Sequence, residues 1–156
     1  MSSSGYASPS SIMSFYSNTT GSTIDSLAIT FDIERYRINT AAASVTFFTS
    51  TNGSTWTAQT AGNSGAFTTG TNAYNFTSGT VISRSVTLTG LGLTNGSSFY
   101  LRWNFDTSGS NSQGLGLDNV SLTASAIPEP STYAAIFGTL ALVGTVWHRR
   151  RQRKAV

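Results

Sequence analysis

Three side chains in well-patterned stretches of this sequence have the chemistry of a ligand contact. Trp56 follows a turn signal, and an indole at such a place can stack on a pyranose ring. Glu34 and Arg102 are charged residues within alternating segments, and an arginine can hold a carboxylate or a sugar hydroxyl. Each also has a plain structural explanation, Trp56 as a core anchor and Glu34 as the cross-strand partner of Arg102 or Arg37.

Oxygen-bearing side chains near the end of the patterned region are candidate calcium ligands. Asp106, Asp118 and Asn119 follow or interrupt two apolar alternations, so they are expected at one end of a sheet. Calcium takes about six to eight oxygen ligands, which loop carbonyls would have to complete. No EF-hand or aspartate-repeat spacing accompanies these residues, and loop capping by Asx-turns explains them equally well.

Residue types that most enzymes need are absent from most of the chain. The sequence has no cysteine, which excludes disulfides, thiolate metal sites and a cysteine nucleophile. The only histidine is His148 and the only lysine is Lys154, so residues 1–126 cannot supply a Ser-His-Asp set. A pair of carboxylates could still act as acid and base, although the sequence does not show their separation. The candidates for such a pair are Asp32, Glu34, Asp106 and Asp118. We therefore expect a non-enzymatic protein without a resident cofactor, the calcium site apart.

Alternation of apolar and polar residues is the leading structural signal between residues 12 and 124. It is clearest over residues 27–33 and 99–105, and Asn52-Gly53 and Asn95-Gly96 mark hairpin turns. The phase changes after Glu34 and near Asn119, which suggests bulges or bends. The pattern predicts an all-β, antiparallel β-sandwich over residues 23–124. The expected core anchors are Phe31, Phe47, Trp56, Trp103 and Phe105.

Charge is divided unevenly along the chain. The 156 residues carry a formal net charge of +3. Residues 1–126 hold four arginines and five carboxylates, a net charge of −1, whereas residues 127–156 hold five basic residues and Glu129, a net charge of +4. The basic balance therefore belongs to the C-terminal end, and we expect no nucleic-acid partner for the main domain.

The C-terminal end has three successive parts. Residues 125–130 form a linker with Pro128, Glu129 and Pro130, and two prolines hold such a segment extended. Residues 131–147 are uncharged and would span about 26 Å as a helix, which predicts a short transmembrane helix. Residues 148–156 form a basic tail that the positive-inside rule places in the cytoplasm. A buried amphipathic helix and a nucleic-acid-binding tail are the alternatives.

This order of parts resembles the PEP-CTERM sorting signal of Gram-negative bacteria, over about residues 127–154. The resemblance implies that the membrane enzyme exosortase recognises Pro128, Glu129 and Pro130. It also implies anchoring in the inner membrane until processing, and then a place at the cell surface or in the extracellular matrix. The stop signal would be Arg149, Arg150, Arg151, Arg153 and Lys154.

Four stretches of the main domain resemble a jelly-roll module of bacterial surface proteins: residues 18–24, 31–37, 99–103 and 116–120. More chain usually precedes the first stretch in that pattern, and Met1–Ser10 lacks the features of a signal peptide. We therefore expect residues 1–22 to be a truncated N-terminal segment. The expected function is that of an exported surface or matrix protein. The alternatives are a lectin-like module bound to exopolysaccharide and a fragment of a secreted degradative enzyme.

Overall fold

The chain forms a β-rich unit and a separate helical unit. The computed structural model describes residues 10–76, 79–107, 111–126 and 130–152. The chain divides into two compact units, one over Met1–Ser125 and the other over Ala126–Val156. Pro128, Glu129, Arg153 and Lys154 of the expected sorting signal lie outside the described residues.

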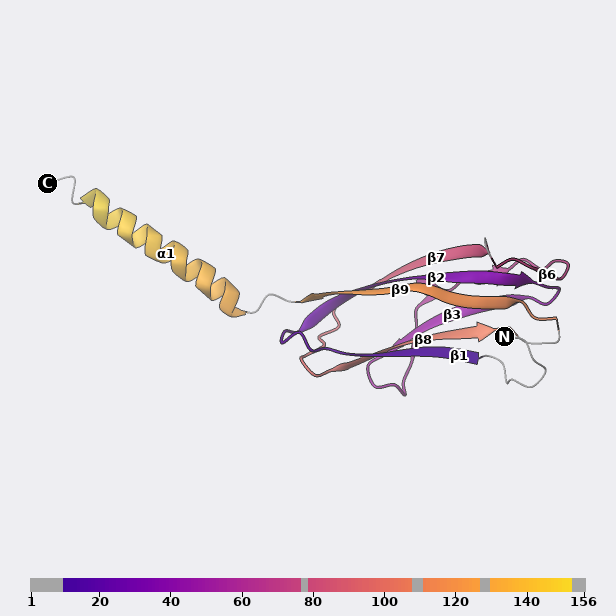
Figure 1. Ribbon diagram of the computed structural model, residues 1–156. Coiled ribbons are helices and arrows are strands. Elements are labelled where there is room, and N and C mark those ends of the chain that lie inside the picture. Colours follow the sequence, from indigo (N-terminus) through magenta and orange to yellow (C-terminus); the bar gives the residue numbers. More distant parts are fainter. Residues whose placement is uncertain (1–9, 77–78, 108–110, 127–129, 153–156) are drawn as a thin grey trace. The chain divides into compact units, whose positions relative to one another are not determined.

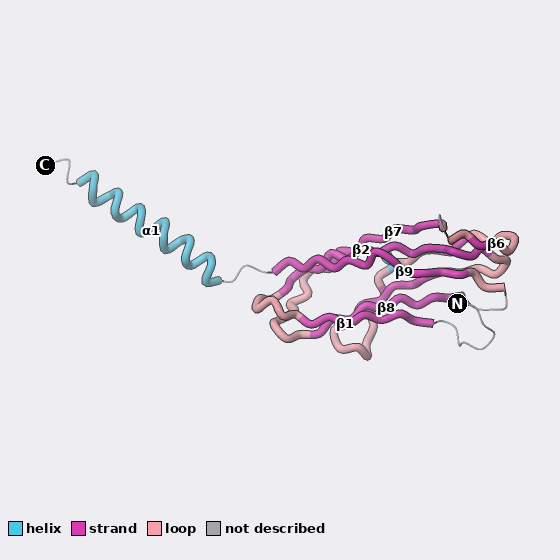
Figure 2. Tube along the Cα trace, in the orientation of Figure 1, coloured by secondary structure: helices cyan, strands magenta, loops and turns pink. Residues whose placement is uncertain are grey.

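Two sheets make up the β-rich unit. The described strands are β1 (Ser10–Ser17), β2 (Ile24–Ile38), β3 (Ala43–Ser50), β4 (Thr57–Ala58), β5 (Gly65–Phe67), β6 (Ala73–Tyr74), β7 (Thr80–Leu88), β8 (Ser98–Asp106) and β9 (Gly114–Ala126). One sheet has the order β1-β8-β3-β4, with β5 also on β3, and the other has the order β6-β2-β7, with β9 also on β2. Figures 1 and 2 show the two layers, and a short 3-10 helix, η1 (Thr60–Gly62), follows β4.

The core lies between the facing sides of the two sheets. β2 directs Ile29, Phe31 and Ile33 inward, each at most 1% exposed, as its alternation predicts. Phe47 of β3 and Trp103 of β8 meet Phe31 there, with ring centroids 4.9 Å and 5.4 Å away. Because these three rings come from both sheets, they tie the layers together, and the predicted β-sandwich is confirmed.

The sandwich begins earlier than the sequence indicated. β1 pairs antiparallel with β8 along its whole length, from Ser10 opposite Phe105 to Ser17 opposite Ser98. Residues 10–17, which we expected in a separate N-terminal segment, are therefore an edge strand of the first sheet.

The two predicted phase changes have different causes. Asn119 has a φ of 51°, and β9 turns Leu115 and Leu117 to the core before it and Leu122 after it, so a bend is present there. β2 instead continues without interruption to Ile38, and beyond Arg35 it changes its partner from β7 to β6.

The second unit contains a helix, α1 (Pro130–Gln152), which covers the predicted residues 131–147 and continues into the basic tail. It starts at a proline, which suits the first helical position, and extends through Arg149, Arg150 and Arg151. Within the described ranges, no helix combines the length and the apolar character needed to cross a membrane. The membrane role expected for residues 131–147 stays a prediction.

Candidate ligand-binding face

Alternate residues of the first sheet place a group of aromatic side chains on its outer side. Strand register sets Phe15 opposite Tyr100, and it aligns Met13, Arg102 and Phe48 in one row across β1, β8 and β3. We call this surface the aromatic face. Its members are Met13, Phe15, Phe48, Trp56, Tyr100 and Arg102.

Arg102 lies over two of these rings. Its guanidinium carbon is 4.2 Å from the centroid of the Trp56 ring and 5.0 Å from that of the Phe48 ring. A cation over an aromatic face is attracted by the ring quadrupole, by about 0.5–2 kcal/mol for each contact. The two rings therefore hold the guanidinium in one place, whereas Trp103, the next residue along β8, is fully buried on the inner side.

The turn between β3 and β4 delivers Trp56 to this place. The side-chain oxygen of Asn52 accepts hydrogen bonds from the backbone N–H groups of Ser54 and Thr55, at 2.9 Å and 2.8 Å. Gly53, at a φ of 72°, lies so close to Tyr100 that an added Cβ would be 3.1 Å from the ring carbon Cζ. The local turn chemistry of this segment thus presses the loop onto Tyr100 and brings the indole over the sheet.

The edge of the aromatic face is open to solvent. Phe15 is 60% exposed and Met13 is 64% exposed, and the Phe15 ring centroid lies 5.1 Å from that of Tyr100. Large apolar side chains exposed together are a mark of an interaction surface. On the other side of Arg102, Ser11 and Asn104 provide polar groups joined by a 2.7 Å hydrogen bond.

Of the three predicted ligand contacts, the fold brings two together. Trp56 and Arg102 meet, and the interpretation of Trp56 as a core anchor is wrong because its ring packs on the outer side of the sheet. Glu34 lies in β2 of the other sheet, where it accepts a hydrogen bond from the Tyr36 hydroxyl. The expected ion pair of Glu34 with Arg102 is therefore excluded by their different sheets.

The other expected partner of Glu34 is also engaged elsewhere. Arg37 donates a 2.9 Å hydrogen bond to the side chain of Asn72, and its guanidinium carbon lies 5.2 Å from the Tyr74 ring centroid. No ion pair between Glu34 and Arg37 is present in the described part of the chain.

The candidate calcium ligands belong to different sheets. Asp106 ends β8, opposite Ser44, whereas Asp118 and Asn119 lie in β9 beside β2. The Asn119 amide donates a 2.8 Å hydrogen bond to Asp32, and its backbone N–H donates one of 2.7 Å to Asp118. Among the described residues, no group of three or more His, Cys, Asp or Glu side chains could hold a metal ion. The expected calcium set is thus not assembled there.

Hydrogen bonding shapes the charge of Asp32. The Ser83 hydroxyl, directly opposite on β7, and the Asn119 amide both stabilise the carboxylate and lower the pKa of Asp32 below its usual value of 3.8. Asp32 is half-buried on the second sheet, and its hydrogen bond with Asn119 secures the bend of β9 against β2.

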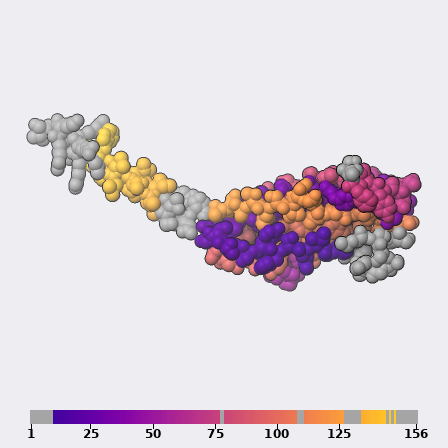
Figure 3. Space-filling model, viewed as in Figure 1, coloured from indigo at the N-terminus to yellow at the C-terminus, as the bar shows by residue number. Residues whose placement is uncertain are grey.

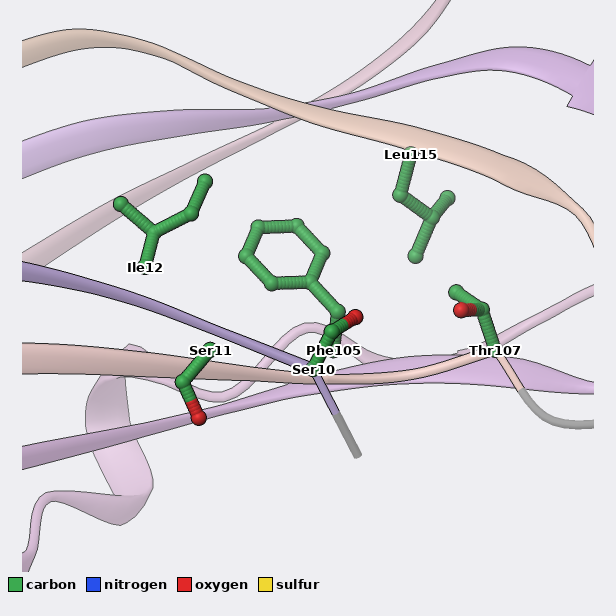
Figure 4. A pocket seen from close by; sticks show the side chains of 6 residues that line it. All are labelled: Ser10, Ser11, Ile12, Phe105, Thr107 and Leu115. Atoms are coloured by element: carbon green, nitrogen blue, oxygen red, sulfur yellow. The ribbon is translucent and has the colours of Figure 1, made fainter. Parts of the chain in front are cut away.

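Hollows lined by described residues of the sandwich differ in size. One, of about 60 Å³, lies where the edge strand β1 approaches β9, and Figure 4 shows Ile12, Phe105 and Leu115 around it. Figure 3 shows the side of the β-rich unit on which β1 and β9 lie. This hollow is far below the roughly 300 Å³ at which ligand pockets begin. The other, of about 530 Å³, borders the same β3–β4 hairpin and has uncharged polar side chains such as Ser50, Thr57 and Thr87.

The sequence did not indicate most of the aromatic face. Phe48, Tyr100, Phe15 and Met13 occupy outward positions of alternating strands, which is the only signal they give. No protein-family model matches the chain, and no curated protein matches its sequence.

Proposed function

We propose that this chain is an exported, non-enzymatic cell-surface or extracellular-matrix protein whose β-sandwich binds carbohydrate through the aromatic face. The observation that carries the proposal is the stacking of Arg102 on the rings of Trp56 and Phe48, one row along the sheet from the exposed Phe15. Aromatic rings that share a surface with hydroxyl and amide groups match a sugar, which has an apolar ring face and a polar edge. The expected partner is exopolysaccharide of the cell envelope. The sandwich that binds it is proposed to be of the jelly-roll type.

Binding of the full chain to an array of neutral and charged glycans tests the carbohydrate proposal. Trp56→Ala is expected to abolish binding, because the indole is one wall of the aromatic face. Tyr74→Ala is the matched control, since Tyr74 is a 58% exposed aromatic residue of β6 in the other sheet. Binding that survives Trp56→Ala, or no binding to any glycan, would refute the proposal.

The C-terminal segment supplies the proposed route. Its proline-flanked Glu129, the uncharged run and the basic end follow a compact β unit from which they are separate in structure. We infer that the segment directs the chain to exosortase at the inner membrane of a Gram-negative bacterium, and that processing near Glu129 precedes release to the surface. Support for this route comes from the sequence resemblance and from the helix that begins at Pro130.

Processing in the native host tests this route. Glu129→Ala is expected to leave the unprocessed form in the membrane fraction, whereas Glu34→Ala, a change in the sandwich, should mature normally. Equal maturation of both variants on a gel would contradict recognition by exosortase. Deletion of residues 131–154 is expected to move the protein out of the membrane fraction. The alternative of a secreted degradative enzyme predicts a catalytic domain before residue 1. The intact mass of the mature protein would reveal such a domain.

A further inference from the structure

Arg102 differs from the other arginines of the sandwich in its hydrogen bonding. Arg35 donates to the Thr68 carbonyl at 2.9 Å, Arg37 to Asn72 at 2.9 Å, and Arg84 to the Asn63 carbonyl at 2.7 Å. Within the described part of the chain, the Arg102 guanidinium has neither a hydrogen bond nor an ion pair, and its Nε is enclosed without a partner. The stacking rings hold this cation, and none of the described side chains satisfies its donors.

The described strand neighbours of Arg102 are uncharged. Met13 and Phe48 lie directly opposite it on the two neighbouring strands, and the next row along the sheet contains Phe15 and Tyr100. The row on the other side contains Asn104, whose side-chain oxygen already accepts the Ser11 hydrogen bond. Asp106, at the end of β8, is opposite Ser44 rather than beside Arg102. A ligand on this face therefore meets one fixed positive charge with aromatic side chains on one side and an amide on the other.

We propose that the ligand of the aromatic face is an acidic polysaccharide, a polymer of uronic acid residues. This inference rests on the proposed carbohydrate binding and names its substrate class. A uronate carries a planar carboxylate, which matches the fork of N–H donors of a guanidinium, and its pyranose ring packs on aromatic side chains. The rings of Trp56 and Phe48 pre-orient Arg102, so little side-chain entropy is lost when the carboxylate binds.

A matched pair of polymers tests this class. Polygalacturonate and its fully methyl-esterified form have the same backbone, and only the first is charged. The full-length protein is expected to bind polygalacturonate and to bind the ester about 10-fold or more weakly, as for loss of a charge-assisted contact. Equal affinity for the two polymers would overturn the inference.

Arginine variants separate this site from the basic C-terminal end, which every variant retains. Arg102→Gln is expected to weaken polygalacturonate binding about 10- to 100-fold. Arg37→Gln removes the same charge from the other sheet and should bind like the wild type. Arg102→Lys keeps the charge without the planar fork, so its affinity for polygalacturonate should lie between those of the wild type and Arg102→Gln. This variant tests the site if Arg102→Gln fails to fold.

The outcomes distinguish this inference from the proposed function. If Arg102→Gln binds polygalacturonate like the wild type, the inference is wrong. If neutral glycans bind in a Trp56-dependent manner while polygalacturonate does not bind, the carbohydrate proposal stands and the acidic class is wrong. If neither neutral nor acidic polymers bind, both proposals fail.

Discussion

The guanidinium of Arg102 lies against the indole of Trp56, at 4.2 Å from the ring centroid, although Arg102 belongs to β8 and Trp56 to the loop before β4. The contact depends on the antiparallel pairing of β3 with β8 and on the turn that returns the chain toward β4. The contact orders the Arg102 side chain, because this long flexible side chain is held by two aromatic rings. The carbohydrate and uronate proposals both depend on this geometry.

The two tryptophans of the sandwich should affect stability very differently. Trp103 is fully buried and its ring centroid lies 5.2 Å from that of Phe47, so Trp103→Ala is expected to cost about 3–5 kcal/mol of unfolding free energy. Trp56→Ala removes an outer contact with Arg102 and should cost about 1 kcal/mol or less. Urea unfolding followed by circular dichroism measures both. Equal losses would contradict the outer position of Trp56.

Gly53 should be needed for more than its backbone conformation. Gly53 and Gly21 both have positive φ values, 72° and 78°, so an alanine is strained at either place. An added Cβ meets Tyr100 at position 53 and open space at position 21. Gly53→Ala is therefore expected to destabilise the protein by about 1–3 kcal/mol, more than the matched Gly21→Ala. Equal urea midpoints for the two variants would show that the contact with Tyr100 has no effect.

Acid should weaken the fold partly through Asp32. Because the pKa of Asp32 in the folded protein is lowered below the value of 3.8, the ionised side chain stabilises the fold above that pH. This stabilisation is lost as the pH falls through the lower, folded pKa. Asp32→Asn should therefore show a shallower loss of stability on acidification below about pH 4 than the wild type, in thermal unfolding at a series of pH values. The same dependence of stability on pH in the wild type and in Asp32→Asn would argue against the stabilising hydrogen bonds of Asp32.

Variants of the two donors to Asp32 provide the control for that experiment. Ser83→Ala should raise the pKa of Asp32, since the Ser83 hydrogen bond is the largest cause of its lowering. Asn119→Gly removes the second donor and keeps a residue that tolerates the φ of 51°. NMR titration of the Asp32 carboxyl is expected to show a higher pKa in both variants. If the pKa of Asp32 stays at its wild-type value in one of the variants, the donor removed in that variant does not lower it.

Much of the fold was predictable because side-chain alternation is a local property. Residues 27–33 and 99–105 face the core at every second position, as their sequence indicated. The helix covers the predicted residues 131–147 and extends beyond them at both ends, to Pro130 and Gln152. The prediction of Trp56 as a core anchor was wrong because it required Trp56 to lie in a strand with its side chain directed inward. Instead β4 starts only at Thr57, and Trp56 packs on Arg102 before it.

The sequence alone determined which side of each strand is apolar, where the turns fall, and that a helix follows a proline-containing linker, since these follow from residues near one another in the chain. Only the tertiary structure decided that β1 belongs to the first sheet, that Glu34 and Arg102 lie in different sheets, and that Arg102 meets Trp56. The physical reason is that strand partners and register are selected by the packing of the whole core, so outward residues share a surface only after distant strands have paired.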